Sequence, residues 1–318
     1  MKIKMEERVS LMIRKIMRFV TDSDYRFVTL DRRGFYNSMD DEKYLKKKFK
    51  VRMGKELNLE NPKAFNEKLQ WLKLYDRKDE YTTMVDKYEV KSYIADKIGE
   101  EYIIPTLGVW DKFEDIDFDK LPDQFVLKCT HDSGGLVICK DKSKLDINAA
   151  KKKINNCLKK NFYYCGREWP YKNVKPRIIA EEYMENIENG VEGLRDYKFY
   201  CVDGDVKYLY VSEGLEDHST AKISFLTVDW KFAEFGRSDY KGFDELPQKP
   251  KNFDKMIVLA KELSKGFAFL RVDLYEINGK VYFSELTFSP CGGFMPFAPA
   301  EWDYKFGEYI KLPDKVIL

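Results

Sequence analysis

The stretch "FLRVDLYEINGKVYFSELTFSPCGG", residues 269–293, decides the fold class because two strand-like runs flank Asn278-Gly279. Val, Ile, Tyr and Phe favour strands, and Asn-Gly between such runs is a strong signal for a β-hairpin. Four polar residues interrupt the apolar pattern: Arg271, Asp273, Glu285 and Thr287. The connection between the two strands decides whether these four side chains share one face.

A two-residue turn at Asn278-Gly279 is the shorter connection that this sequence allows. It would place Asp273 opposite Ser284, so that Glu285 would point to the other face of the hairpin. The polar side chains would then be scattered over both faces.

A three-residue loop closed by Gly279 in the left-handed conformation is the longer connection. It would pair Asp273 with Phe283 and Arg271 with Glu285. All four polar side chains would share one face, while Val272, Leu274, Tyr282, Ser284 and Leu286 would take the other. We expect this register, because it keeps the apolar residues together.

The polar face of the hairpin needs positive charge, because carboxylates on neighbouring strands repel each other. Arg271 would supply that charge in a structural ion pair. A divalent cation is the alternative: two or three oxygen atoms on one wall suit Mg²⁺, which takes further ligands from water and phosphates. The glycines of the following "SPCGG" would let the backbone approach a ligand closely.

The composition is that of a globular protein with room for two or three lobes. The chain has 318 residues, of which 44% are hydrophobic and 15% aromatic. Its net charge of +2 gives no argument for nucleic-acid binding. Six cysteines without a C-x-x-C pair, together with only two histidines, argue against a standard zinc site and a disulfide framework. Reduced cysteines favour a cytoplasmic location.

The order of helical and strand-like segments predicts an α+β fold. The first eighty-odd residues have mostly helical periodicity, and further helical stretches cover 147–160 and 252–265. Short runs rich in Val, Ile, Tyr and Phe alternate with turns from residue 125 onward. We therefore expect a helical N-terminal region followed by one or two antiparallel sheets.

The first twenty residues predict an amphipathic helix rather than a transmembrane segment or signal peptide, because charges interrupt every apolar run. Its apolar side is formed by Met5, Val9, Met12, Ile13, Ile16, Met17 and Val20. Packing against the core is the plainer interpretation of this side. Peripheral contact with a membrane surface is the sharper one.

Lysines and glycines between two strand-like runs offer a place for phosphates. In "FVLKCTHDSGGLVICKD", residues 125–141, Lys128 ends one run and a glycine-containing loop leads to the next. Such a loop can present backbone N–H groups to phosphates, although no GK[ST] closes it as in a Walker A loop. An ordinary hairpin turn is the alternative. Further on, "RIIAEEYMEN" ends in Glu181-Glu182, and "GLRDYKFYCVDG" places Asp196 and Lys198 on one strand face.

This ordered series resembles the ATP-grasp superfamily and, within it, the TupA-like (teichuronopeptide-biosynthesis-type) branch. The resemblance runs from about residue 60 to residue 300. Its motifs are "NPKAFNEKLQWLKLYD", "MVDKYEVKSYIADKIGEEYIIPTLGVW", "FVLKCTHDSGG", "DYKFYCVDG" and "RVDLYEINGKVYFSELTFSPCGG". It implies two α+β lobes whose antiparallel sheets clasp a nucleotide, here residues 85–190 and 191–318. A helical region, residues 1–84, precedes them.

The resemblance also implies roles for individual residues. The ATP-binding residues would be Lys87, Lys128, His131, Ser133, Gly134, Gly135, Glu181, Glu182, Tyr183, Met184 and Asp196. Among these, the two lysines would grip phosphates, the glycine loop would close over them, the segment from 181 to 184 would meet adenine, and Asp196 would lie near the ribose. Lys198 and Arg271 would act on the transferred phosphoryl group. The magnesium ligands would be Asp273, Glu285 and Thr287. Many family members have Asn at the last position, so Thr287 leaves a second metal ion in question.

By the same resemblance, the activity would be that of an ADP-forming carboxylate–amine ligase with an acyl-phosphate intermediate. The cofactors would be ATP and Mg²⁺, with Mn²⁺ as a substitute. The substrates would be a small-molecule or glycan-linked carboxylate and an amine, in cell-surface polysaccharide biosynthesis. Substrate contacts are expected from polar or aromatic loops that contain Arg167, Trp169, His218 and Arg237.

Two other functional classes stay open at this point. A metal-dependent glycosyltransferase would use Asp203-Gly204-Asp205 as a D-x-D motif, although Asp-Gly between two strands is also an ordinary turn. A nucleotide-binding protein without catalytic activity is the third class.

Overall fold

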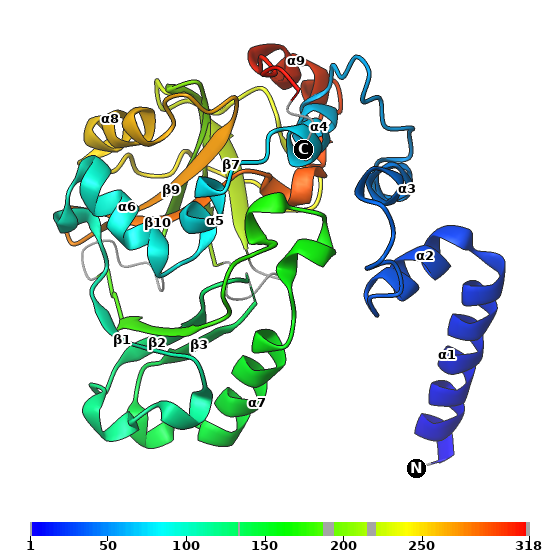
Figure 1. Cartoon of the computed structure of the whole chain (residues 1–318), viewed down its shortest axis with the longest axis horizontal. Helices are drawn as coiled ribbons and strands as arrows, with labels where there is room; N and C mark the ends of the chain where they lie inside the picture. Colours follow the sequence, from blue (N-terminus) through cyan, green and yellow to red (C-terminus); the bar gives the residue numbers. More distant parts are fainter. Residues whose placement is uncertain (1, 133, 187–193, 215–220, 316–318) are drawn as a thin grey trace. The chain divides into compact units, whose positions relative to one another are not determined.

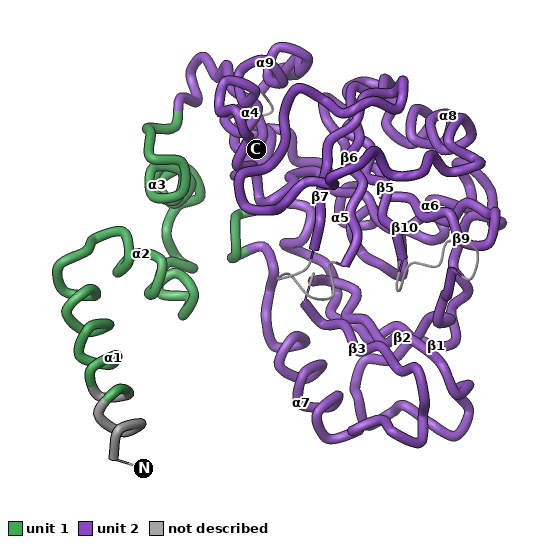
Figure 2. The backbone as a smooth tube through the Cα atoms, turned by 180° about the vertical axis from the view of Figure 1, so that it is seen from behind, with its two compact units in different colours: residues 1–57, 164–167 green, residues 58–163, 168–318 purple. Residues whose placement is uncertain are grey.

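The computed structural model describes residues 2–132, 134–186, 194–214 and 221–315. Ser133 and His218, both named above, lie outside this described part. The chain divides into two compact units (Figure 2): unit 1 comprises residues 1–57 and 164–167, and unit 2 comprises residues 58–163 and 168–318. The finer division at residues 84 and 190 stays a prediction.

Six α-helices precede the first strand, as expected for an α+β protein with a helical N-terminal region (Figure 1). The α-helices are α1 (Lys2–Thr21), α2 (Ser23–Asp31), α3 (Asp41–Met53), α4 (Phe65–Tyr75), α5 (Glu80–Val85), α6 (Glu89–Ile98), α7 (Ile147–Leu158), α8 (Phe253–Leu263) and α9 (Trp302–Tyr309). The 3-10 helices are η1 (Glu100–Tyr102), η2 (Phe113–Asp115), η3 (Phe118–Lys120), η4 (Lys142–Lys144), η5 (Phe162–Cys165), η6 (Trp169–Tyr171) and η7 (Pro290–Gly293). The strands are β1 (Thr106–Trp110), β2 (Phe125–Cys129), β3 (Leu136–Cys139), β4 (Ile178–Glu182), β5 (Asp196–Val202), β6 (Asp205–Glu213), β7 (Lys222–Leu226), β8 (Gly236–Arg237), β9 (Leu270–Ile277), β10 (Lys280–Thr287) and β11 (Phe297–Ala298).

Unit 1 is helical, and capping residues set where its helices begin. The side chain of Asp22 accepts a hydrogen bond from Tyr25 N (2.8 Å) at the start of α2, and Asp40 accepts one from Lys43 N (3.0 Å) at the start of α3. Gly54 ends α3 in the left-handed conformation (φ 69°). Among the described residues, no helix is long and apolar enough to cross a membrane.

Unit 2 contains the antiparallel sheets. One has four strands in the order β1-β4-β2-β3, and another has five in the order β10-β9-β5-β6-β7. Strands β8 and β11 form a small two-stranded sheet. Every pairing within these sheets is antiparallel, which confirms the expectation from the sequence.

Helices cover both faces of the five-stranded sheet. Side chains from α5, α6 and α8 form one apolar cluster with the face that carries Phe199, Val272 and Leu274. On the opposite face, Tyr200 and Phe269 pack with α4 and α9. In the four-stranded sheet, α7 packs on β2 and β3 through a separate apolar cluster (Figure 1).

The β9–β10 hairpin differs from the expected register. Ile277 pairs with Lys280, so the connection is the two-residue turn Asn278-Gly279, and both of its residues have positive φ (49° and 73°). Positive φ at both positions is the signature of a type I′ turn. The predicted three-residue loop is therefore wrong.

A β-bulge further along β10 restores the shared polar face. Phe283 pairs with Leu274, but the next pair is Glu285 with Asp273, so Ser284 is the extra residue. Beyond the bulge, Thr287 pairs with Arg271. The four polar residues thus lie on one face, as expected. The apolar assignment needs correction, because Val281 and Phe283 are in the core, not Tyr282 and Ser284.

Candidate active site

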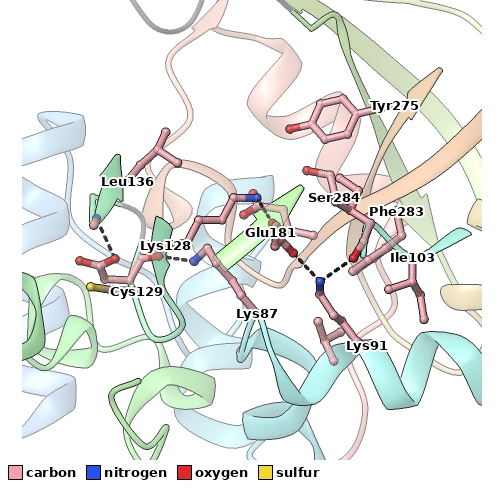
Figure 3. Close-up of a pocket in the computed structure, with 15 residues that line it drawn as sticks. Lys87, Lys91, Ile103, Lys128, Cys129, Leu136, Glu181, Tyr275, Phe283 and Ser284 are labelled. Atoms are coloured by element: carbon pink, nitrogen blue, oxygen red, sulfur yellow. Dashed lines mark hydrogen bonds and ion pairs between the residues drawn. The ribbon is translucent and has the colours of Figure 1, made fainter. Parts of the chain in front are cut away.

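A cavity of about 270 Å³ lies within unit 2, beside the edge strand β10 and the strands β2 and β4 (Figure 3). This volume is near the lower end of the range for small-molecule sites. The lining residues are Lys87, Val90, Lys91, Ile103, Ile104, Lys128, Cys129, Asp132, Gly135, Leu136, Glu181, Tyr275, Phe283, Ser284 and Glu285. The cavity therefore joins the predicted lysines and the glycine loop to one acid of the hairpin.

Two of its lysines hold the carboxylate of Glu181 (Figure 3). Lys128 Nζ lies 2.5 Å from Glu181 Oε2, and Lys91 Nζ lies 2.6 Å from Oε1. Burial would raise the pKa of Glu181, but the positive charges of Lys128 and Lys91 outweigh burial and lower it. Glu181 is thus ionised, and its carboxylate forms ion pairs with the two lysines.

Lys87 is positioned by the loop that it faces. Its Nζ donates a hydrogen bond to the carbonyl oxygen of Asp132, and its backbone N–H donates to Thr130 O (3.1 Å). Asp86 accepts hydrogen bonds from the two N–H groups at the start of α6, and Arg177 binds its carboxylate (2.8 Å). The backbone before α6 therefore fixes the direction of the Lys87 side chain.

The loop from residue 131 to 135 contributes only some of its residues to the cavity. Gly135 lines it, whereas His131 and Gly134 do not. His131 is buried, and its Nε2 lies 3.1 Å from the carbonyl oxygens of Cys157 and Lys160, so it fastens the loop to the end of α7.

Gly135 is held on both sides of its backbone. Its N–H donates to Asp132 Oδ1 (2.9 Å), and its carbonyl oxygen accepts from Cys129 N (2.7 Å).

The ligand atoms of Cys129, Asp132 and Cys157 lie within 4.8 Å of one another. These are three potential metal ligands, one fewer than a structural zinc site uses.

Behind the cavity wall, Arg271 connects the two acids of the hairpin. Its guanidinium donates two hydrogen bonds to Asp273 (2.7 and 2.6 Å) and one to Glu285 Oε1 (2.6 Å). Lys198 Nζ also binds Asp273 (2.5 Å) and lies 3.2 Å from Asp196. The structural ion pair considered for Arg271 is therefore present in this structure.

Glu285 is the acid that reaches the cavity. Its side chain is 38% exposed and accepts a hydrogen bond from Thr287 Oγ1 (3.1 Å). Burial would raise its pKa, but the positive charges of Arg271, Lys198 and Lys87 outweigh burial and lower it to about 2. An ionised carboxylate at the edge of a cavity fits the ligand preference of Mg²⁺.

Asp273 fits a metal ion less well than Glu285. Its side chain has no exposed surface, and both of its oxygens accept hydrogen bonds from cationic side chains. It would reach a metal ion only after Lys198 or Arg271 moved. The donor set therefore fits one cation at Glu285, with Thr287 beside it.

The segment expected to meet adenine is divided between two faces of β4. Glu181 points into the cavity, whereas Glu182 and Tyr183 line a separate open groove of about 1010 Å³. Met184 lines neither of them. Side chains of this segment are therefore not gathered around the cavity, and its backbone is the part able to face a base there.

The other described candidates, Arg167, Trp169 and Arg237, do not line the cavity. Arg167 belongs to unit 1, where it binds Asp41 (2.9 Å), and Arg237 binds Asp239 (2.8 and 2.7 Å). Trp169 lines a small cavity of about 20 Å³ with Phe267.

Residues of the D-x-D motif do not line the cavity. Asp203 and Gly204, with φ of 46° and 76°, form the turn between β5 and β6. Asp205 is bound by Lys207 (2.7 Å). The ordinary hairpin turn accounts for this motif.

Lys91 is the functional candidate that sequence reasoning missed. It follows Lys87 by four residues, the spacing of neighbours on one side of a helix, although in the structure only Lys91 lies on α6 and Lys87 lies in the turn before it. That spacing was the available signal. Tyr275 and Ser284 also line the cavity, and Ser284 is the extra residue of the bulge.

Comparison with known proteins gives one family match. The family model described as TupA-like ATPgrasp matches residues 67–311. No curated protein matches the chain significantly.

Solved structures similar to this chain include the ATP-grasp ligase PsnB with a phosphomimetic variant of its minimal precursor, Mg and ADP (12% identity, TM-score 0.38). The similarity covers 66% of this chain and 52% of PsnB. D-alanine–D-alanine ligase from Bacillus anthracis with ATP is 16% identical, with a TM-score of 0.39 and coverage of 72% and 65%. The Helicobacter pylori enzyme is 12% identical, with a TM-score of 0.40 and coverage of 77% and 65%. The chain thus spans about half of PsnB and just under two thirds of these two ligases.

Proposed function

The chain belongs to the TupA-like ATP-grasp family, and from this membership we propose that it is an ATP-dependent ligase that joins a carboxylate to an amine. One observation carries the proposal. Every residue that lines the cavity lies inside the matched range, and the cavity combines three lysines with two ionised glutamates, Glu181 and Glu285. Those are the charges that a nucleotide with its cation requires.

In this proposal, Lys87, Lys91 and Lys128 bind the phosphates of ATP. Phosphate oxygens would compete with Glu181 for two of these lysines, so nucleotide binding exchanges one set of ion pairs for another. Gly135 brings the backbone of the loop close to the same place. The backbone of residues 181–184 and Asp196 would meet adenine and ribose.

Glu285 and Thr287 would hold Mg²⁺, with Asp273 as a further ligand once its ion pairs open. Mg²⁺, or Mn²⁺ in its place, would neutralise negative charge on the phosphates when bound. Arg271 and Lys198 keep positive charge next to these acids, which stabilises charge on the phosphoryl group as it moves.

The reaction proposed here needs no nucleophile from the protein. A substrate carboxylate oxygen attacks the γ-phosphorus, the bond to the β-phosphate oxygen breaks, and ADP leaves. The amine then attacks the acyl carbon, loses a proton and displaces inorganic phosphate, which leaves an amide. The side chains around the cavity act by orienting reactants and by balancing charge.

The proposed biological setting is cell-surface polysaccharide biosynthesis in the cytoplasm, with an amino acid or amino group attached to a small or glycan-linked acid. The family resemblance supports this setting.

Thermal unfolding with nucleotides tests the proposal. The chain is heated with Mg²⁺–ADP or a non-hydrolysable ATP analogue, and separately with UDP-sugars and Mn²⁺. A ligand at a hundred times its dissociation constant adds about 2.7 kcal/mol of stability. We expect the adenine nucleotide to raise the unfolding temperature, and Glu285→Gln and Asp273→Asn to reduce this rise. Asp254→Asn, at an exposed position on α8, is the control with the same loss of charge.

Three outcomes separate the functional classes. ADP release from a panel of acids and amines supports the ligase. Stabilisation by UDP-sugars alone would contradict it and direct attention to Asp203 and Asp205. Nucleotide binding without ADP release under any combination would identify a binding protein without catalysis.

A further inference from the structure

Most of the described side chains of α1 are exposed. Six of its apolar residues have exposed fractions of 50–66%, Phe19 is half-buried, and no α1 side chain in the described part is buried. These exposed apolar residues are Leu11, Met12, Ile13, Ile16, Met17 and Val20. Buried side chains of unit 1 instead lie outside α1, for example Phe27 of α2 and Phe49 of α3. Core packing within unit 1 therefore does not explain why α1 is amphipathic.

At 100° per residue, the exposed apolar side chains form one continuous face of α1. Met12, Ile16, Val20, Ile13 and Met17 follow one another within an arc of about 140°. Arg14 and Lys15 lie about 60° beyond the two edges of this arc, and Arg18 lies opposite its middle. Leu11 falls among these basic residues, so among the described side chains of α1 it is the exposed apolar one outside the apolar face.

The charge of α1 indicates what covers this face. Its sequence has six basic residues and only two acidic ones. A second copy of the helix, packed on the apolar face, would bring basic flanks of both copies together, and an arc of 140° is wider than a coiled-coil seam. A basic amphipathic helix with a wide apolar face is the type that lies in the interface of an anionic lipid bilayer.

We propose that α1 docks the protein on an anionic lipid surface, with Met12, Ile13, Ile16, Met17 and Val20 inserted between the headgroups. The axis of α1, about 30 Å long, lies in the plane of the interface. The basic residues contact the headgroups from the flanks of the helix. This inference is independent of the proposed ligase activity, because it involves neither the cavity nor a nucleotide.

Co-sedimentation of the full chain with vesicles tests this docking. The vesicles contain phosphatidylcholine alone, or phosphatidylcholine mixed equally with phosphatidylglycerol. We expect binding to the mixed vesicles, weakened by added salt, and much weaker binding to phosphatidylcholine. The double variant Met12→Gln/Ile16→Gln should bind at least about a hundredfold more weakly, because each substitution removes a large apolar side chain from the membrane. Leu11→Gln, on the opposite face, should bind like the unchanged protein.

The basic residues need their own variant and control. Arg14→Gln/Lys15→Gln should weaken binding to the mixed vesicles about 25-fold, at about fivefold per charge. Lys152→Gln/Lys153→Gln on α7 makes the same change of net charge on exposed residues elsewhere and should have little effect.

Failure to bind the mixed vesicles overturns the proposal, and so does binding that Met12→Gln/Ile16→Gln leaves intact. Sedimentation velocity gives the remaining outcome. A dimer that this double variant dissociates, together with no vesicle binding, would assign the apolar face to a second copy of the chain.

Discussion

In the loop from residue 131 to 135, Gly135 has less room for a side chain than Gly134. A Cβ added at Gly135 would lie 2.5 Å from Cys129 Sγ, closer than non-bonded atoms approach. We expect Gly135→Ala to lower the free energy of unfolding by about 1–3 kcal/mol and to weaken nucleotide binding. The control is Gly134→Ala, because the nearest atom to its added Cβ is 3.9 Å away. Urea unfolding and nucleotide titration measure both effects, and equal losses in the two variants would contradict the prediction.

The pKa of Glu285 predicts how this residue contributes to stability as the pH changes. The pKa is lowered from 4.5 to about 2 in the folded protein, so Glu285 stabilises the fold fully above about pH 4.5. As the pH falls toward 2, the unfolded chain takes up the proton first and this contribution disappears. The difference in unfolding free energy between the unchanged protein and Glu285→Gln should therefore shrink between pH 6 and pH 3.

The exposed Glu245 provides the comparison for this pH dependence. Glu245→Gln should change the unfolding free energy little at either pH, since a solvated carboxylate contributes little. A difference for Glu285→Gln that grows as the pH falls would show that its ionised form does not stabilise the fold.

Single residues show what sequence reasoning could and could not predict. Lys87, Lys128, Gly135 and Glu285 were predicted to belong together, and the structure places all four at one cavity. The burial of Asp273 was not predictable, because it depends on Lys198 reaching it from β5, the strand that pairs with β9. Strand order over long sequence separations leaves no local pattern in the sequence.

At the scale of elements, the β9–β10 hairpin shows why a correct face can follow from a wrong register. The two-residue turn shifts the pairing by one residue from the expected register, and the bulge at Ser284 shifts it by one more in the same direction, so Glu285 pairs with Asp273 rather than with Arg271. A total shift of two residues keeps Glu285 on the expected face, whereas the shift of one between the turn and the bulge reverses the faces there. Alternation of residue types alone therefore indicated the polar face, but it did not identify the turn.

Deletion of Ser284 tests the bulge directly. Without this residue, Phe283 still pairs with Leu274 and Glu285 still pairs with Asp273, so we expect the fold to persist. Deletion of Tyr282 is the matched control, because it would move Phe283 out of the core and put Ser284 in its place. Loss of a buried Phe costs about 3–5 kcal/mol, so this control should be the less stable variant in urea unfolding. The opposite order of stability would show that the bulge is elsewhere.

At the scale of the whole molecule, the α+β class and the antiparallel sheets followed from the order of helical and strand-like patterns. The division into units did not. Residues 164–167 are counted with residues 1–57, although more than a hundred residues separate them in the chain. Residues 164–167 belong with residues 1–57 because the buried Arg167 binds residues of that segment, not because the composition of the chain changes at residue 164.

Arg167 also tests how the units unfold. Its guanidinium binds Asp41 (2.9 Å) and the carbonyl oxygen of Tyr36 (2.7 Å), and it stacks 4.2 Å from the ring centre of Tyr44. We expect Arg167→Ala to destabilise unit 1 by about 3–5 kcal/mol, because it removes a fully buried side chain together with its ion pair and its packing on Tyr44. Limited proteolysis should then cleave within residues 1–57 sooner.

Stabilisation of unit 2 by nucleotide should be unchanged in Arg167→Ala, since the cavity lies wholly in unit 2. The exposed Arg33→Ala serves as the control within unit 1. Unchanged proteolysis of Arg167→Ala would show that this side chain does not hold unit 1 together.

The contact between α4 and α9 can form only after nearly the whole chain has been synthesised. Asn66 of α4 binds Asp303 of α9 through both its backbone N–H and its side chain (2.9 Å each), across 237 residues of chain. A ribosome that adds about 5–20 residues per second needs roughly 10–50 s to cover that distance. For that interval, Phe65 and Leu69 of α4 have none of their α9 partners, and the growing chain presents them to any chaperone that holds unfolded apolar segments. The face of the sheet that adjoins the cavity is therefore among the last parts of the molecule to be completed.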